Sequence, residues 1–281
     1  MTSRSIKKTI SAMETSDGAG VRIKRSIGQS QAVRLDPFLM LDEFGSDQAE
    51  DYIAGFPSHP HRGFETVTYM IEGHMLHEDH LGNRGHLKNG GVQWMTAGRG
   101  IIHSEMPQQE EGAMRGFQLW LNLPAKDKMM PAGYRDIQPE DIPQIRVTAG
   151  LIKLIAGQLE LEGQSYTGAE TGGATRPLYA DIHLMPGMTL DVPVAAELDG
   201  MIYLYEGHAS LAGAALQASA ANVLSDGTRI ELEAGPAGAR MLLIAGKPIG
   251  EPIVQYGPFV MTTREDIEQA MRDYRAGTLT A

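Results

Sequence analysis

The chain carries one strand-and-turn pattern twice, and this repeat constrains the fold more than any other feature of the sequence. In the first copy, His59-Pro60-His61 precedes the run Tyr69-Met70-Ile71-Glu72-Gly73-His74. In the second copy, Val192-Pro193-Val194 precedes Tyr203-Leu204-Tyr205-Glu206-Gly207-His208 at nearly the same spacing. Such a recurrence indicates that one β-unit of about 100 residues was duplicated. Because valine replaces histidine in the second copy, we expect one barrel equipped with polar ligands and one without them.

Most of the chain outside the repeat also has the character of short strands. The runs Thr66–Ile71, Phe117–Leu123 and Met241–Ile244 are β-branched, aromatic or aliphatic and have strand length. The 33 glycines and 15 prolines are spread along the chain and punctuate these runs with turns. We therefore expect an all-β fold of two tandem barrels, with domains at residues 1–145 and 146–250.

The last segment, residues 251–281, has a different pattern. Thr262 followed by Glu265 forms a capping box, which is typical of a helix start, and Gly277 supplies a C-terminal stop. Four residues between them repeat at helical spacing: Ile267, Ala270, Met271 and Tyr274. We expect one amphipathic helix that packs back on the barrels to bury this stripe.

Composition and charge exclude several classes of function. A net charge of −11 argues against nucleic-acid binding, because phosphates favour clustered lysine and arginine. The basic cluster of Arg22, Lys24 and Arg25 is therefore interpreted as a solvated strand face. No run approaches eighteen apolar residues, so we expect no membrane span. The absence of cysteine excludes disulfides and thiolate ligands, and together with a polar N-terminus it favours a cytoplasmic protein.

Histidines are concentrated in the first copy of the repeat, where seven of the nine lie between His59 and His103. His59 and His61 are two residues apart, so in a strand both rings point to one face. His103 and Glu105 have the same spacing. Two strands that each present such a pair can converge on one ion, with three imidazoles and one carboxylate as ligands. These donors suit Fe, Mn, Ni, Cu or Zn.

Two alternatives to this ligand set remain open from the sequence. Glu65 lies four residues after His61 and competes with Glu105 as the carboxylate if the strand continues. His77, Glu78, Asp79 and His80 resemble a further site, but they precede Leu81-Gly82-Asn83, so a solvated turn is the favoured interpretation.

Four long runs in this chain resemble the pirin family of the cupin superfamily. They are Phe38–Phe44, His59–Val67, Gln93–Pro107 and Gln118–Leu123. The resemblance implies a bicupin, in which two jelly-roll (double-stranded β-helix) barrels are followed by a C-terminal helix. It also implies one divalent ion, in the first barrel only, bound by His59, His61, His103 and Glu105. Fe(II) is the first choice for this ion, and Zn, Mn, Ni or Cu are the alternatives.

The resemblance also carries expectations about function. Pirin-like proteins are associated with quercetin 2,3-dioxygenase activity, so we expect a metal-dependent oxidoreductase that opens a flavonol with O2. Glu105 would be both ligand and catalytic base. Glu65, Phe56, Met70, Met95 and Trp120 are candidates to line the cavity or support the ligands. The alternative is a metal- or redox-sensing regulator that binds a transcriptional or metabolic protein partner.

Overall fold

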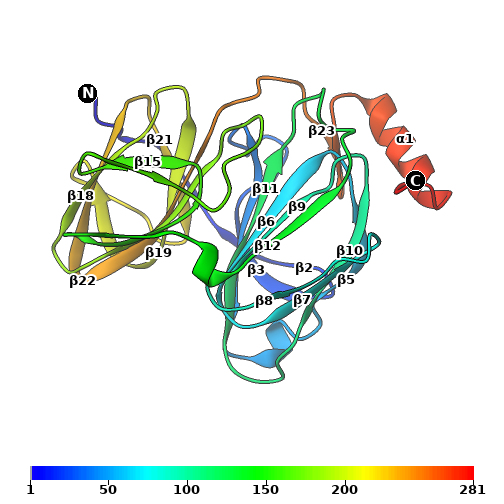
Figure 1. The fold of residues 1–281 in the computed structure, drawn as a ribbon, viewed down its shortest axis with the longest axis horizontal. Coiled ribbons are helices and arrows are strands. Elements are labelled where there is room, and N and C mark those ends of the chain that lie inside the picture. Colours follow the sequence, from blue (N-terminus) through cyan, green and yellow to red (C-terminus); the bar gives the residue numbers. More distant parts are fainter. Residues whose placement is uncertain (1) are drawn as a thin grey trace. The chain divides into compact units, whose positions relative to one another are not determined.

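The computed structural model describes residues 2–281 and consists mostly of β-strands, with one α-helix near the C-terminus (Figure 1). The chain divides into two compact units by its internal contacts. The first barrel comprises Met13–Arg34, Phe38–Pro139 and Ile249–Ala281, and the second barrel comprises Met1–Ala12, Leu35–Pro37 and Glu140–Pro248. The sequence predicts contiguous segments, whereas in the structure the first strand belongs with the second barrel and the C-terminal tail with the first.

The first barrel is built from two sheets. Its strands are β2 (Met13–Asp17), β3 (Val21–Ile27), β4 (Phe38–Ser46), β5 (Phe56–His61), β6 (Phe64–Glu72), β7 (Met75–Asp79), β8 (Arg84–Leu87), β9 (Val92–Thr96), β10 (Ile101–Pro107), β11 (Met114–Asn122), β12 (Gly133–Ile137), β23 (Val254–Tyr256) and β24 (Phe259–Met261). A seven-stranded sheet has the order β12-β9-β6-β11-β4-β3-β2, and a four-stranded sheet has the order β5-β10-β7-β8. Strands β23 and β24 form a separate hairpin.

Contacts between side chains show that these two sheets face each other. Trp120 of the larger sheet lies against His61 of the smaller one, with ring centroids 5.3 Å apart. Thr68 on β6 donates a hydrogen bond across the barrel to Glu105 on β10. Residues that alternate toward this interior therefore come from both sheets, as in a jelly roll.

The second barrel is built mainly from one long sheet. Its strands are β1 (Ile6–Ser11), β13 (Gln144–Val147), β14 (Gly150–Ala156), β15 (Gln158–Leu161), β16 (Gln164–Thr167), β17 (Leu178–Leu184), β18 (Thr189–Pro193), β19 (Asp199–Leu211), β20 (Ala214–Ala215), β21 (Ala220–Leu224) and β22 (Arg229–Gly246). Seven of them have the order β1-β21-β19-β22-β17-β14-β13, while β18 pairs with β22, β20 with β19, and β15 with β16.

Strand register shows what the second barrel has in place of the histidine pairs. Val192 lies opposite Ile230, as His59 lies opposite His103 in the first barrel. The next position on the same face of the strand, two residues on, is Leu232 in the second barrel and Glu105 in the first. Val192, Val194, Ile230 and Leu232 are all buried in one apolar core cluster. Apolar side chains thus fill the positions that carry imidazoles and a carboxylate in the first barrel.

The C-terminal helix α1 (Arg264–Arg275) packs on the first barrel, as part of the same unit. Ile267 and Ala270 are buried in a cluster with Phe259 and Met261 of β24. The predicted cap is wrong by one residue, because Thr263 is the N-cap and its hydroxyl accepts a hydrogen bond from the Asp266 amide at 3.1 Å. Two short 3-10 helices, Ala49–Asp51 and Pro139–Asp141, complete the elements. Within residues 2–281 no helix has the length and apolar character needed to cross a membrane.

Candidate metal centre

Three histidines converge on one point inside the first barrel. Strands β5 and β10 pair so that His59 lies directly opposite His103, while His61 lies two residues further along β5. One ring nitrogen from each of His59, His61 and His103 lies within 4.8 Å of the other two. The structure therefore brings together the three imidazoles that the sequence predicts.

The hydrogen bonds of these rings leave their inner nitrogens available to a cation. His59 Nδ1 lies 2.8 Å from the Pro57 carbonyl oxygen, to which it donates, so its Nε2 carries the lone pair. That Nε2 faces His61 Nε2 at 3.0 Å. His103 Nε2 is buried with no hydrogen-bond partner among the described residues. A lone pair on His59 Nε2, a second imidazole nitrogen beside it and a buried His103 nitrogen without a partner fit a site for a divalent ion.

Burial keeps two of these imidazoles neutral. Desolvation and the neighbouring His59 lower the pKa of His61 well below its usual value. The pKa of His103 is lowered in the same way, by burial and then by His61, His59 and His77. Neutral imidazole is the form that binds a metal, so the folded chain has these two ligands ready at neutral pH.

The two candidate carboxylates lie in different places. Glu105 is buried, lines the same pocket as His59 and His61, and accepts a hydrogen bond from Thr68 at 3.2 Å. Its oxygens fall outside the 4.8 Å group of the three ring nitrogens. Glu65 is not brought to the cluster. Strand β5 ends at His61, and on β6 Glu65 points away from the interior to Thr96, whose hydroxyl donates to it at 2.6 Å.

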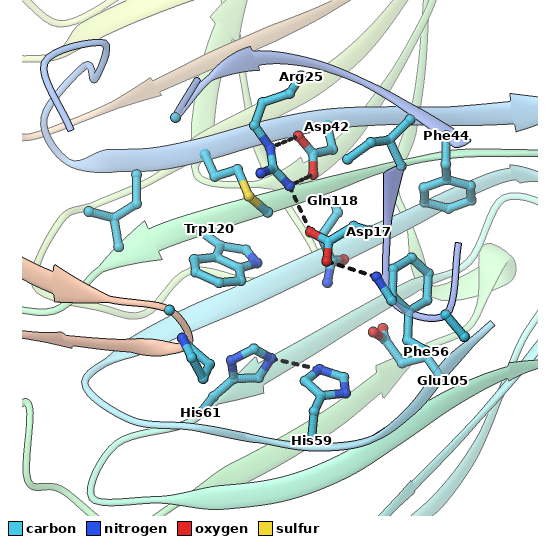
Figure 2. Close-up of a pocket in the computed structure, with 18 of the residues that line it drawn as sticks. Asp17, Arg25, Asp42, Phe44, Phe56, His59, His61, Glu105, Gln118 and Trp120 are labelled. Carbon is cyan, nitrogen blue, oxygen red and sulfur yellow. Dashed lines mark hydrogen bonds and ion pairs between the residues drawn. The ribbon is translucent and has the colours of Figure 1, made fainter. Parts of the chain in front are cut away.

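A cavity of about 600 Å³ opens beside the histidines. His59, His61 and Glu105 form one part of its lining, and Phe56 and Trp120 supply aromatic walls (Figure 2). Two other predicted lining residues are absent from this pocket: Met70 is buried in a cluster with Phe44 and Tyr52, and Met95 in a cluster with Ile101.

Comparison with known proteins assigns the chain to a family. The model of the pirin family matches residues 20–121, and that of the pirin C-terminal cupin domain matches residues 179–280. This chain belongs to the pirin family. Its two barrels are therefore tandem cupin domains.

Relatives and solved structures agree with this assignment. A Pseudomonas aeruginosa protein, provisionally named as a quercetin 2,3-dioxygenase, is 56% identical over 94% of this chain and 94% of its own. Human pirin is 39% identical over 97% of this chain and 93% of its own. A crystal structure described as quercetin 2,3-dioxygenase from Acinetobacter baumannii has a TM-score of 0.88 and 31% identity, covering 99% of both chains.

The opposite side of the pocket of this pirin carries charged residues that the sequence did not reveal. Arg25 donates to both carboxylate oxygens of Asp42, at 2.8 and 2.7 Å, and to Asp17 at 2.7 Å (Figure 2). Arg22 and Lys24 are exposed as predicted, but Arg25 is not. Arg25 lies two residues after Ile23 on β3, so both side chains share the inward face of the strand and line the pocket.

A second group was missed because its segment was interpreted as a solvated turn. His77 and Asp79 lie on β7, which pairs with β10, and His77 is only 1% exposed. This places His77 directly behind the metal centre, 3.4 Å from His103 between their Nδ1 atoms. The spacing of two between His77 and Asp79 was the available signal, since it is the same spacing that identified the ligand pairs.

Proposed function

We propose that this pirin is a metal-dependent dioxygenase that opens a flavonol such as quercetin, with one divalent ion in the first barrel. Fe(II) is the first choice for this ion, and Zn, Mn, Ni or Cu are the alternatives. The observation that carries the proposal is the convergence of three imidazoles, two of which, His59 and His61, line a pocket of about 600 Å³ with aromatic sides. A volume of this size suits a small organic ligand. The names of the similar proteins from P. aeruginosa and A. baumannii favour the same chemistry.

His59, His61, His103 and Glu105 would hold the ion. Glu105 follows His103 by two residues on β10, so both side chains extend to the same face of the strand. Both are buried, and the Glu105 carboxylate reaches the pocket. A bound ion would polarise the enolic oxygen of the substrate and provide the redox contact that O2 requires.

The pocket complements a flat molecule with hydroxyl groups along its edge. Phe56 and Trp120 offer apolar faces on which aromatic rings can stack. Gln118, Asp17 and Arg25 offer hydrogen-bonding groups at a distance from the histidines (Figure 2). This combination of apolar walls and a few polar groups would orient a flavonol with its reactive ring toward the histidines.

Glu105 is also the group positioned to accept the substrate's proton. Its carboxylate is buried and close to where the enolic hydroxyl would lie. Thr68 donates to one carboxylate oxygen, Oε1. The Thr68 hydroxyl also contacts the Gln118 side-chain amide, so the carboxylate is held by a short chain of polar groups rather than by solvent.

Oxygen uptake with quercetin under air tests the proposal. Metal-free protein, protein reloaded with Fe(II), and reloaded His61→Ala are compared, with His86→Ala as the control because His86 is exposed and lies outside the pocket. We expect quercetin-dependent oxygen uptake in the reloaded wild type and in His86→Ala only. Equal uptake by metal-free protein, or by His61→Ala, would contradict the proposed function.

A further inference from the structure

Behind the metal centre lies a buried polar pair to which the proposed function gives no role. His77 and Asp79 occupy alternate positions on β7, so their side chains share a face. In the pairing with β10, Asp79 lies opposite His103 and His77 lies opposite Glu105. The Asp79 side chain has no exposed surface, and His77 is 1% exposed. Buried polar groups of this kind require hydrogen-bond partners. Here the contacts of the pair connect it to His103, a proposed metal ligand.

The contacts run in one line from Asp79 to His103. Asp79 Oδ2 lies 3.2 Å from His77 Nε2, and His77 Nδ1 lies 3.4 Å from His103 Nδ1. These distances are at the long end for hydrogen bonds, as is common where a site tightens only on binding. The other ring nitrogen of His103, Nε2, is the buried atom without a partner among the described residues.

Asp79 is fixed as an acceptor by its own turn. Its Oδ1 accepts from the backbone amides of Leu81 at 2.9 Å and Asn83 at 3.1 Å. Its Oδ2 accepts from the Asn83 side-chain amide at 2.9 Å, in addition to the contact with His77. With three donors from the turn holding it, the carboxylate can only receive the proton that His77 Nε2 presents.

That constraint assigns each proton along the line. A neutral His77 that donates from Nε2 must accept at Nδ1. His103 must then donate from Nδ1, which leaves the lone pair on Nε2, the buried atom that has no hydrogen-bond partner among the described residues. This arrangement of protons is the one required if His103 is to bind a cation through Nε2.

Tyr134 on β12 sets the plane of the His77 ring. The two rings are stacked with centroids 4.2 Å apart and planes 17° from parallel. Stacking on the half-buried Tyr134 ring restricts rotation of the imidazole about its Cβ–Cγ bond. His77 is thus held with one nitrogen toward Asp79 and the other toward His103.

We propose that Asp79 and His77 form a hydrogen-bond relay that keeps the proton of His103 on Nδ1 and presents its Nε2 lone pair to the metal. The relay rests on the proposed metal centre and deepens it. His77 and Asp79 are positioning residues, since neither touches the ion. His59 is oriented more simply, by the Pro57 carbonyl. Residues that orient a metal-binding side chain through a hydrogen bond change metal affinity by about 10- to 100-fold.

Binding of Co(II) to the metal-free protein tests the relay without reference to activity. Affinities are measured for the wild type, His77→Phe, Asp79→Asn and the double variant. His77→Phe keeps a ring to stack on Tyr134 but removes both nitrogens. His86→Gln is the matched control, because His86 lies on the neighbouring strand β8 and is exposed.

We expect His77→Phe to weaken Co(II) binding about 10- to 100-fold and Asp79→Asn by a smaller factor. The double variant should bind no more weakly than His77→Phe alone, because Asp79 acts only through His77. The visible absorption bands of bound Co(II) should shift in both single variants and remain unchanged in His86→Gln. His77→Gln, which restores an acceptor for His103 Nδ1, should recover part of the affinity lost in His77→Phe.

Three results would overturn the relay. Unchanged affinity in His77→Phe and Asp79→Asn, with a wild type that binds Co(II), would remove the relay and leave the metal centre standing. Additive losses in the double variant would show that Asp79 acts by another route. A wild type that fails to bind Co(II) would remove the proposed centre and the relay together. If His77→Phe does not fold, Asp79→Asn and His77→Gln decide the matter by the same measurements.

Discussion

Replacing Arg62 by Met should release the C-terminal helix from the first barrel. Arg62 follows the proposed ligand His61, and its side chain is only 4% exposed. It donates to the carbonyl oxygens of Arg99 and Leu279 and to the Asp273 carboxylate, the last at 2.7 Å. The ligand strand and the tail of the chain are therefore connected by one buried cation.

The expected cost follows from these contacts. Losing one side of a buried ion pair costs about 3–5 kcal/mol, because the partner is left without compensation. The Asp273 side chain is 23% exposed, so water can solvate part of the abandoned charge. We therefore expect the free energy of local opening of α1 to fall by about 3 kcal/mol. This corresponds to about a hundredfold faster amide hydrogen exchange.

Hydrogen exchange at Ile267 and Ala270, the buried residues of α1, is the appropriate assay. Arg272→Met is the matched control: Arg272 lies on the same helix, its side chain is 59% exposed, and its contacts are a 3.9 Å ion pair with Glu268 and an exposed hydrogen bond to Gln269. Exposed pairs of this kind contribute less than about 1 kcal/mol. Equal exchange rates in Arg62→Met, Arg272→Met and the wild type would refute the assignment of Arg62 as the residue that holds the tail.

Three further outcomes are expected. Glu105→Gln should reduce metal retention, measured by elemental analysis, more than Glu65→Gln, because Glu65 is bonded to Thr96 outside the pocket; the reverse order would make Glu65 the ligand. Titration of metal-free protein should give one ion per chain, since apolar residues fill the second barrel; a second ion that survives loss of His59 and His61 would contradict this. The pKa values of His61 and His103 are lowered in the fold, so the unfolded chain takes up protons first as pH falls below about 6.5. Urea unfolding of metal-free protein should therefore show about 1 kcal/mol of stability lost for each of these histidines between about pH 6.5 and 5.5. His61→Leu should show a shallower slope, and an identical slope would contradict the pKa assignment.

The repeat and the histidine spacing were sufficient to predict the architecture and the core of the site. A spacing of two places side chains on one face of any strand, so His59 and His61 needed no knowledge of their neighbours. The valines at 192 and 194 likewise predicted an apolar second barrel. Both features are local, so they can be recognised in the sequence without knowledge of which distant segments pair.

Features that depend on strand register could not be predicted in this way. Arg25 meets Asp42 because the register of β3 with β4 places the two residues opposite each other. His77 lies behind His103 because β7 pairs with β10. Strand β1 belongs to the second barrel because Ile6 lies opposite Leu224, a partner far along the chain. Each of these is a contact between distant segments, which periodicity does not encode.

A crystal structure of the metal-loaded protein, with anomalous scattering recorded at the absorption edge of the bound metal, tests the central claim most directly. We expect one anomalous peak per chain, in the first barrel, at about 2.0–2.2 Å from a ring nitrogen of each of His59, His61 and His103 and from an oxygen of Glu105. A peak in the second barrel, or a first-barrel ion that Glu105 does not contact, would contradict it.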